Sequence, residues 1–70
     1  PPEVIHKMVS LLPTGYRTVL NLYVFEGRSH QEIAHLLGIR ERSSSSQLSR
    51  AKNLLAKMIT AYLTQNQTSR

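Results

Sequence analysis

The sequence predicts an all-α domain made of four helices. Apolar residues recur at helical spacing in four segments, and Pro13, Gly27 and Gly38 separate these segments. The chain has 70 residues, so only one small domain is expected, which would bury about 60% of the surface that the unfolded chain exposes. It has no cysteine, so a disulfide framework is excluded. We expect a single domain over residues 1–70, with helices at about 3–12, 14–26, 30–37 and 42–66.

The first two helices are predicted from their apolar spacing. The first carries one amphipathic stripe, formed by Ile5, Met8, Val9 and Leu12. Pro13 ends this helix and suits the first turn of the next one. The second helix is apolar around most of its circumference, so we expect it to be the most buried, with Tyr16, Tyr23 and Phe25 in the core.

The stretch "RSHQEIAHLLG" predicts a short third helix. Ser29 followed three residues later by Glu32 has the spacing of a capping box, directly ahead of an apolar run. Gly38 ends the helix after barely two and a half turns, and another helical segment follows. A short helix, a glycine turn and a further helix together indicate a helix-turn-helix.

The stretch "ERSSSSQLSRA", residues 41 to 51, can be read as a flexible linker or as the start of the last helix. A helical wheel separates the two interpretations. The downstream apolar residues fall on one narrow seam, formed by Leu48, Ala51, Leu55, Met58 and Tyr62. On the same wheel Ser46 and Ser49 lie opposite the seam, and within the serine run only Ser44 projects toward the core. Since a linker has no reason to keep this phase, the serines are predicted to be helical.

Positive charge is concentrated in the last helix. Residues 40–57 hold five cations against Glu41 alone, a net charge of +4 out of +5 for the whole chain. Such a segment favours a polyanionic partner, either nucleic acid or an acidic membrane surface. No apolar stretch approaches the ~20 residues of a membrane span, so we expect a soluble, cytoplasmic protein.

Catalysis and metal binding are not expected. The sequence has no nucleophile elbow, no glycine-rich phosphate loop and no pair of carboxylates that acid–base chemistry would require. His6, His30 and His35 lack a spacing typical of metal ligands, so neither a metal nor a cofactor is predicted.

Three linked motifs resemble one known family. They read "LP..YR.V..LY..EG" at residues 12–27, "S..EIA..LGI" at 29–39 and "S.SQLSRAK..L" at 44–55. Together they resemble region 4 of a bacterial RNA polymerase sigma factor of the extracytoplasmic-function type, in the sigma-70 family. The resemblance covers about residues 11–55, most of the chain.

This resemblance implies a four-helix, wingless helix-turn-helix domain with a long C-terminal recognition helix. It implies binding to the −35 element of double-stranded promoter DNA in transcription initiation, and docking on the β flap of core RNA polymerase. An anti-sigma protein is a further candidate partner, and the domain is expected to be a monomer. The residues expected to contact bases are Ser45, Ser46, Ser49 and Arg50. The residues expected to contact phosphates are Arg28, Ser29, His30, Arg40, Arg42, Gln47, Lys52 and Lys57.

The sequence departs from the usual family pattern near the start of the last helix. The family usually has a serine at Arg40, a glycine at Arg42, a threonine at Ser43 and often a basic residue at Ser45. The additional charges at positions 40 and 42 favour phosphate contacts, which carry no base-specific information.

Two other functions fit the same residues. The output domain of a response regulator also has four helices around a helix-turn-helix, and it would use its last helix to dimerise. A protein-docking module that does not bind DNA alone would instead use exposed apolar residues to bind the polymerase flap or an anti-sigma protein.

Overall fold

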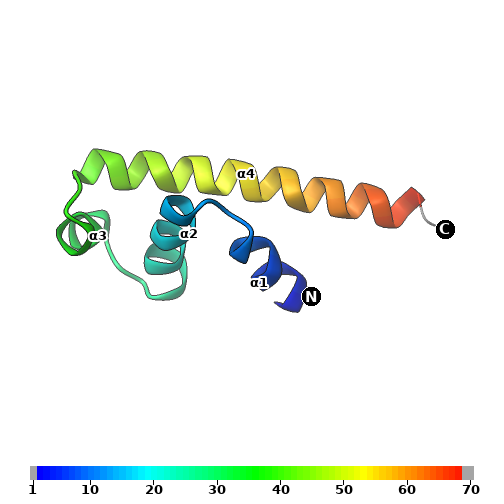
Figure 1. Ribbon diagram of the computed structural model, residues 1–70, viewed down its shortest axis with the longest axis horizontal. Coiled ribbons are helices and arrows are strands. Elements are labelled where there is room, and N and C mark those ends of the chain that lie inside the picture. The colour runs from blue at the N-terminus through cyan, green and yellow to red at the C-terminus, as the bar shows by residue number, and fades with distance from the viewer. Residues whose placement is uncertain (1, 69–70) are drawn as a thin grey trace.

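Four α-helices and one π-helical segment make up the described part of the protein, as expected for an all-α domain. The computed structural model describes the backbone of residues 2–68 and the side chains of residues 2–65, and this part of the chain contains no strand. The elements are α1 (Pro2–Ser10), α2 (Thr14–Leu20), η1 (Asn21–Phe25), α3 (His30–Leu37) and α4 (Glu41–Thr68). Helix α4 runs the length of the molecule, and the other helices lie along one side of it (Figure 1).

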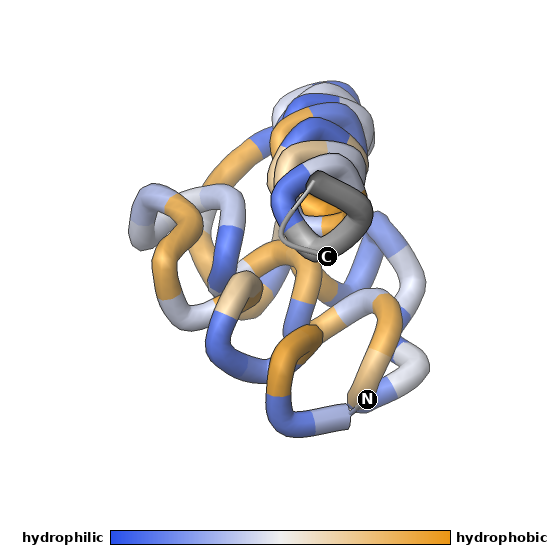
Figure 2. The backbone as a smooth tube through the Cα atoms, turned by 90° about the vertical axis from the view of Figure 1, so that its right-hand side faces the viewer, coloured by the Kyte–Doolittle hydropathy of each residue, from blue (hydrophilic) through white to orange (hydrophobic). Residues whose placement is uncertain are grey.

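The serine run is helical, as the wheel predicted. Helix α4 begins at Glu41 and continues for 28 residues, so the serines occupy its first turns. Ser44 is fully buried, whereas Ser45 and Ser46 are exposed. A view along α4 shows α1, α2 and α3 gathered on one side of it, with the opposite side uncovered (Figure 2).

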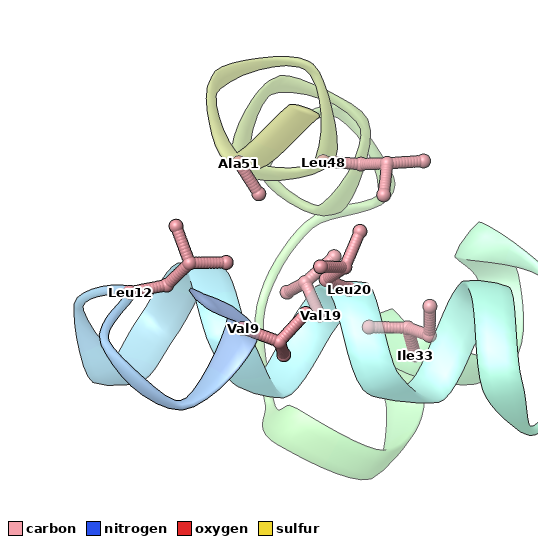
Figure 3. Packing of buried hydrophobic residues seen from close by; sticks show 7 residues of the cluster. All are labelled: Val9, Leu12, Val19, Leu20, Ile33, Leu48 and Ala51. Atoms are coloured by element: carbon pink, nitrogen blue, oxygen red, sulfur yellow. The ribbon is translucent and has the colours of Figure 1, made fainter. Parts of the chain in front are cut away.

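The core lies between α4 and the three shorter helices. Its buried apolar residues come from all four α-helices and from the turn after α1, and they are Val9, Leu12, Val19, Leu20, Ile33, Leu48 and Ala51 (Figure 3). Three of them, Val19, Ile33 and Ala51, have no exposed surface. Further along α4, Leu54, Leu55 and Met58 are partly buried against the same cluster. The predicted seam of α4 is therefore used for packing within the molecule.

The second predicted helix changes its hydrogen bonding before it ends. The α-helix stops at Leu20, and a π-helical turn continues to Phe25, where the Glu26 N–H donates to the Asn21 carbonyl at 3.0 Å. A π-helical turn holds more residues than an α-helical turn, so it changes which side chains face the core. Tyr23 is 37% exposed and Phe25 is 53% exposed. The expectation that both aromatic residues belong to the core was wrong.

The capping box predicted at the start of α3 is present. The Ser29 side chain accepts a hydrogen bond from the Glu32 N–H at 3.1 Å, and the Ser29 N–H donates to the Glu32 carboxylate at 2.9 Å. The bond from Ser29 N–H lowers the pKa of Glu32, with Arg28 acting in the same direction. At the other end, Gly38 has a φ of +67°, a left-handed conformation that glycine adopts without steric cost. The capping box thus fixes the start of α3, and Gly38 fixes the turn from α3 into α4.

Candidate nucleic-acid interface

The exposed side of the first turns of α4 is polar and cationic. All four residues predicted to contact bases are exposed, namely Ser45, Ser46, Ser49 and Arg50. We call these four residues the reading row. Ser44, Leu48 and Ala51 in the same turns are buried. This separation follows from the 100° step between successive residues of a helix, which turns the short hydroxyl side chains outward when the apolar ones turn inward.

Four other cations predicted to contact phosphates are exposed near the reading row and further along α4. They are Arg40, Arg42, Lys52 and Lys57. Within the described residues, both ion pairs involve Arg28, so none of these four side chains is engaged by a carboxylate. Their charges are therefore available to a polyanion.

Arg28 and Ser29, also predicted to contact phosphates, have partners within the protein. Arg28 lies 3.8 Å from a carboxylate oxygen of Glu26 and 3.9 Å from one of Glu32. Both pairs are exposed, so water screens them strongly and Arg28 can exchange either carboxylate for another anion. Ser29 is used as the cap of α3. These two residues are less free than the cations of α4.

Gln47 lies between α4 and α2. Its side chain is half-buried, and a Cβ atom added at Gly15 would come within 2.9 Å of Gln47 Oε1. The glycine at the start of α2 thus leaves room for this side chain. The predicted phosphate contact of Gln47 has no support in the free protein, because the side chain packs against α2.

His30 is the remaining residue predicted to contact a phosphate, and it joins α3 to α4. Its Nδ1 atom is hydrogen-bonded to the buried Ser44 Oγ at 2.8 Å, and its ring stacks on Tyr23 with 4.5 Å between centroids. Among the described residues, Nε2 is the ring nitrogen left for a phosphate. Sequence reasoning missed the bond to Ser44. A signal for it existed, because a serine predicted to face the core needs a polar partner.

A second surface, also missed by sequence reasoning, is apolar. It consists of Tyr23, Val24 and Phe25, which are each more than a third exposed, and we call it the η1 surface. Phe25 lies beside His6 of α1, with 5.8 Å between ring centroids. The end of α2 that carries η1 points away from α4 (Figure 1). Tyr23 at the near end of the η1 surface still reaches α4 indirectly, because it stacks on His30, which is bonded to Ser44.

Other kinds of site receive no support in the described part of the chain. No helix there is long and apolar enough to cross a membrane. No group of three or more His, Asp or Glu side chains is placed to hold a metal ion among those residues.

Helices α3 and α4, joined by the turn at Gly38, form a helix-turn-helix whose second helix presents an uncovered polar and cationic side. This arrangement defines a DNA-binding domain, because an α-helix with such a side fits the major groove.

The family follows from comparison with known proteins. Residues 3–55 match the family model described as "Sigma-70, region 4", and the chain therefore belongs to this family, in the form typical of extracytoplasmic-function sigma factors. Comparisons with curated proteins and with solved structures found no match. Region 4 is a non-enzymatic module that implies binding to −35 promoter DNA and to core RNA polymerase in transcription initiation. The match decides against the response-regulator interpretation.

Proposed function

We propose that this domain reads the −35 element with the first turns of α4 while its η1 surface docks on the β flap of core RNA polymerase. The observation that carries the proposal is the division of α4 into two sides. Ser44, Leu48 and Ala51 are buried, whereas the reading row in the same turns is exposed. A helix held in this way offers its polar side to the major groove without disturbing the core.

The residues of the reading row have different roles in this proposal. Arg50 has a planar guanidinium that donates two hydrogen bonds to O6 and N7 of a guanine. The three serines are short, so the helix can approach the base edges closely. Each hydroxyl both donates and accepts hydrogen bonds, so the serines tolerate several bases directly or through water. The domain alone therefore has modest specificity, which the rest of the polymerase assembly increases.

Arg40, Arg42, Lys52 and Lys57 orient the helix by contacting phosphates. Residues 40–57 have a net charge of +4, and these four cations have no carboxylate partner within the described residues. Phosphate contacts fix the position of a protein on the duplex and supply most of its salt-sensitive affinity. His30 adds a contact through Nε2.

The η1 surface is proposed for docking because it is exposed and apolar, and because the end of α2 that carries it points away from α4 (Figure 1). Aromatic residues contribute strongly to protein interfaces, since each buries a large area with few rotatable bonds. A domain with two distinct surfaces can bind DNA and polymerase at the same time as a monomer. An anti-sigma protein that covers the η1 surface would block the second interaction.

A salt titration tests direct DNA binding. With phosphate contacts from the four cations, we expect the affinity for a promoter duplex to fall by about two orders of magnitude between about 50 and 200 mM salt. Fluorescence anisotropy with the 70-residue chain measures this slope. Replacing both Arg42 and Lys57 with glutamine should make the slope shallower, by the amount that corresponds to about two lost phosphate contacts. A flat salt dependence, or no binding to any promoter duplex, would support the docking module that does not bind DNA.

Phe25→Ser tests the docking surface. Loss of this half-exposed ring should weaken binding to core RNA polymerase by about tenfold, because a central aromatic residue of an interface is removed. Affinity for a promoter duplex should remain unchanged. Leu63→Ser is a matched control, since Leu63 is 54% exposed but lies near the far end of α4. Equal losses in the two variants, measured by biolayer interferometry on immobilised polymerase, would rule out the η1 surface as the docking site.

A further inference from the structure

We propose that His30 is a positioning residue that sets the rotation of α4 about its own axis, and with it the direction of the reading row. This inference rests on the proposed function, in which α4 reads DNA. His30 acts through its hydrogen bond to Ser44, the one inward-facing residue of the serine run.

The geometry of the contact favours this role. Ser44 has no exposed surface, and its hydroxyl is 2.8 Å from His30 Nδ1. The imidazole is itself held by Tyr23, which stacks on it with 21° between the ring planes. Three elements are thus linked in series, from η1 through the first residue of α3 to the second turn of α4. Because the imidazole of His30 is stacked on Tyr23, it has little freedom to move with Ser44 if α4 rotates.

Apolar packing restrains the rotation of α4 less directionally than a hydrogen bond does. Leu48 and Ala51 hold α4 against the core, but hydrophobic burial is non-directional and tolerates small rotations. Side-chain ends lie about 5–6 Å from a helix axis, so a rotation of about 20° displaces them by about 2 Å. A hydrogen bond to a base edge tolerates only a few tenths of an ångström around 2.7–3.2 Å, so about 2 Å breaks it. A directional bond one residue before the reading row limits this rotation.

Neighbouring positions of α4 make Ser44 the natural place for such a bond. Ser45 and Ser46 follow it immediately and both face solvent. Any change in the direction of Ser44 is passed to them through the rigid backbone of the helix. The bond also satisfies a hydroxyl that would otherwise be buried without a partner, which is unfavourable.

Three substitutions separate positioning from simple packing. His30→Phe keeps a ring to stack on Tyr23 but removes Nδ1. His30→Asn removes the ring but leaves a side-chain amide that can donate to Ser44 Oγ. Ser44→Ala removes the other partner. His35→Phe is the control, because His35 is an exposed histidine on the same helix.

The first measurement is selectivity for DNA. The wild-type chain selects duplexes from a random pool, and each variant is then titrated against a selected duplex and a scrambled one. We expect His30→Phe and Ser44→Ala each to lower the affinity ratio by about tenfold, and the double variant to lower it no further. His30→Asn keeps a hydrogen-bond partner for Ser44 but lacks the stacked ring, so its ratio should fall less than that of His30→Phe. Its lost Nε2 phosphate contact weakens both duplexes alike and does not affect the ratio. His35→Phe should not change the ratio. An unchanged ratio in His30→Phe, or additive losses in the double variant, would overturn the proposal.

The second measurement does not depend on DNA. Residual dipolar couplings of N–H and Cα–Hα bonds give the orientation of α4 relative to α2 in the free chain. Rotation of α4 in His30→Phe and Ser44→Ala, with a smaller rotation in His30→Asn, supports the positioning role even if the wild-type chain selects no duplex. Failure of the wild-type chain to select any duplex would contradict the proposed function but not the positioning role. Couplings identical in all variants would overturn the positioning role while leaving the proposed function in place.

Discussion

Replacing Arg50 with alanine is expected to weaken binding to the cognate −35 duplex by about 1–3 kcal/mol and to relax the preference at one base pair. Arg50 is exposed at the end of the reading row and has no carboxylate partner within the described residues. Its guanidinium can therefore form two hydrogen bonds with one guanine, and alanine can form neither. Titration against a panel of duplexes that differ at single base pairs measures both effects.

Lys57→Ala provides the matched comparison for Arg50→Ala. Lys57 is also an exposed cation of α4, but it lies nearly two turns further along the helix. Its proposed contact is with a phosphate, so its loss should weaken all duplexes by a smaller and uniform amount. If the two variants show the same profile across the panel, the division between base contacts and phosphate contacts is wrong.

Replacing Ile33 with alanine is expected to lower the free energy of unfolding by about 2–5 kcal/mol. Ile33 has no exposed surface and lies in the core cluster beside residues of the other helices (Figure 3). Removing three carbon atoms there leaves a cavity that neighbouring helices cannot easily fill. Total stability of a small domain is about 5–15 kcal/mol, so this change removes a large part of it. Urea denaturation followed by circular dichroism measures the loss.

Leu36→Ala on the same helix is the control for Ile33→Ala. Leu36 is 55% exposed, so its truncation should change the unfolding free energy by no more than about 0.5 kcal/mol. Both substitutions introduce alanine into α3 and so have similar effects on helix propensity. Losses of similar size in the two variants would contradict the description of the core.

Much of the fold could be predicted because its signals are local. The capping box at Ser29 and Glu32 acts within one turn, and the left-handed conformation of Gly38 involves a single residue. The sides to which the four serines point could be predicted for the same reason, since a helical wheel needs only the spacing of residues along one helix. All four helices consequently have the expected order, with ends that differ by one or two residues apart from the change to η1.

Prediction failed where the outcome depended on contacts between segments. Tyr23 and Phe25 have the composition of core residues, but the π-helical turn changes which side chains face the core. The half-buried position of Gln47 beside Gly15 likewise depends on α2, and its phosphate contact stays a prediction. Neither result could be obtained from the spacing of residues within one helix.

The amino-acid sequence by itself determined the helices, the helix-turn-helix and the side of α4 that faces solvent, because each depends on a few neighbouring residues. Only the tertiary structure decided that His30 pairs with Ser44, that Tyr23 stacks on His30, and that the η1 surface is exposed. The physical reason is distance along the chain. His30 and Ser44 are 14 residues apart and meet only because the core sets the angle between α3 and α4.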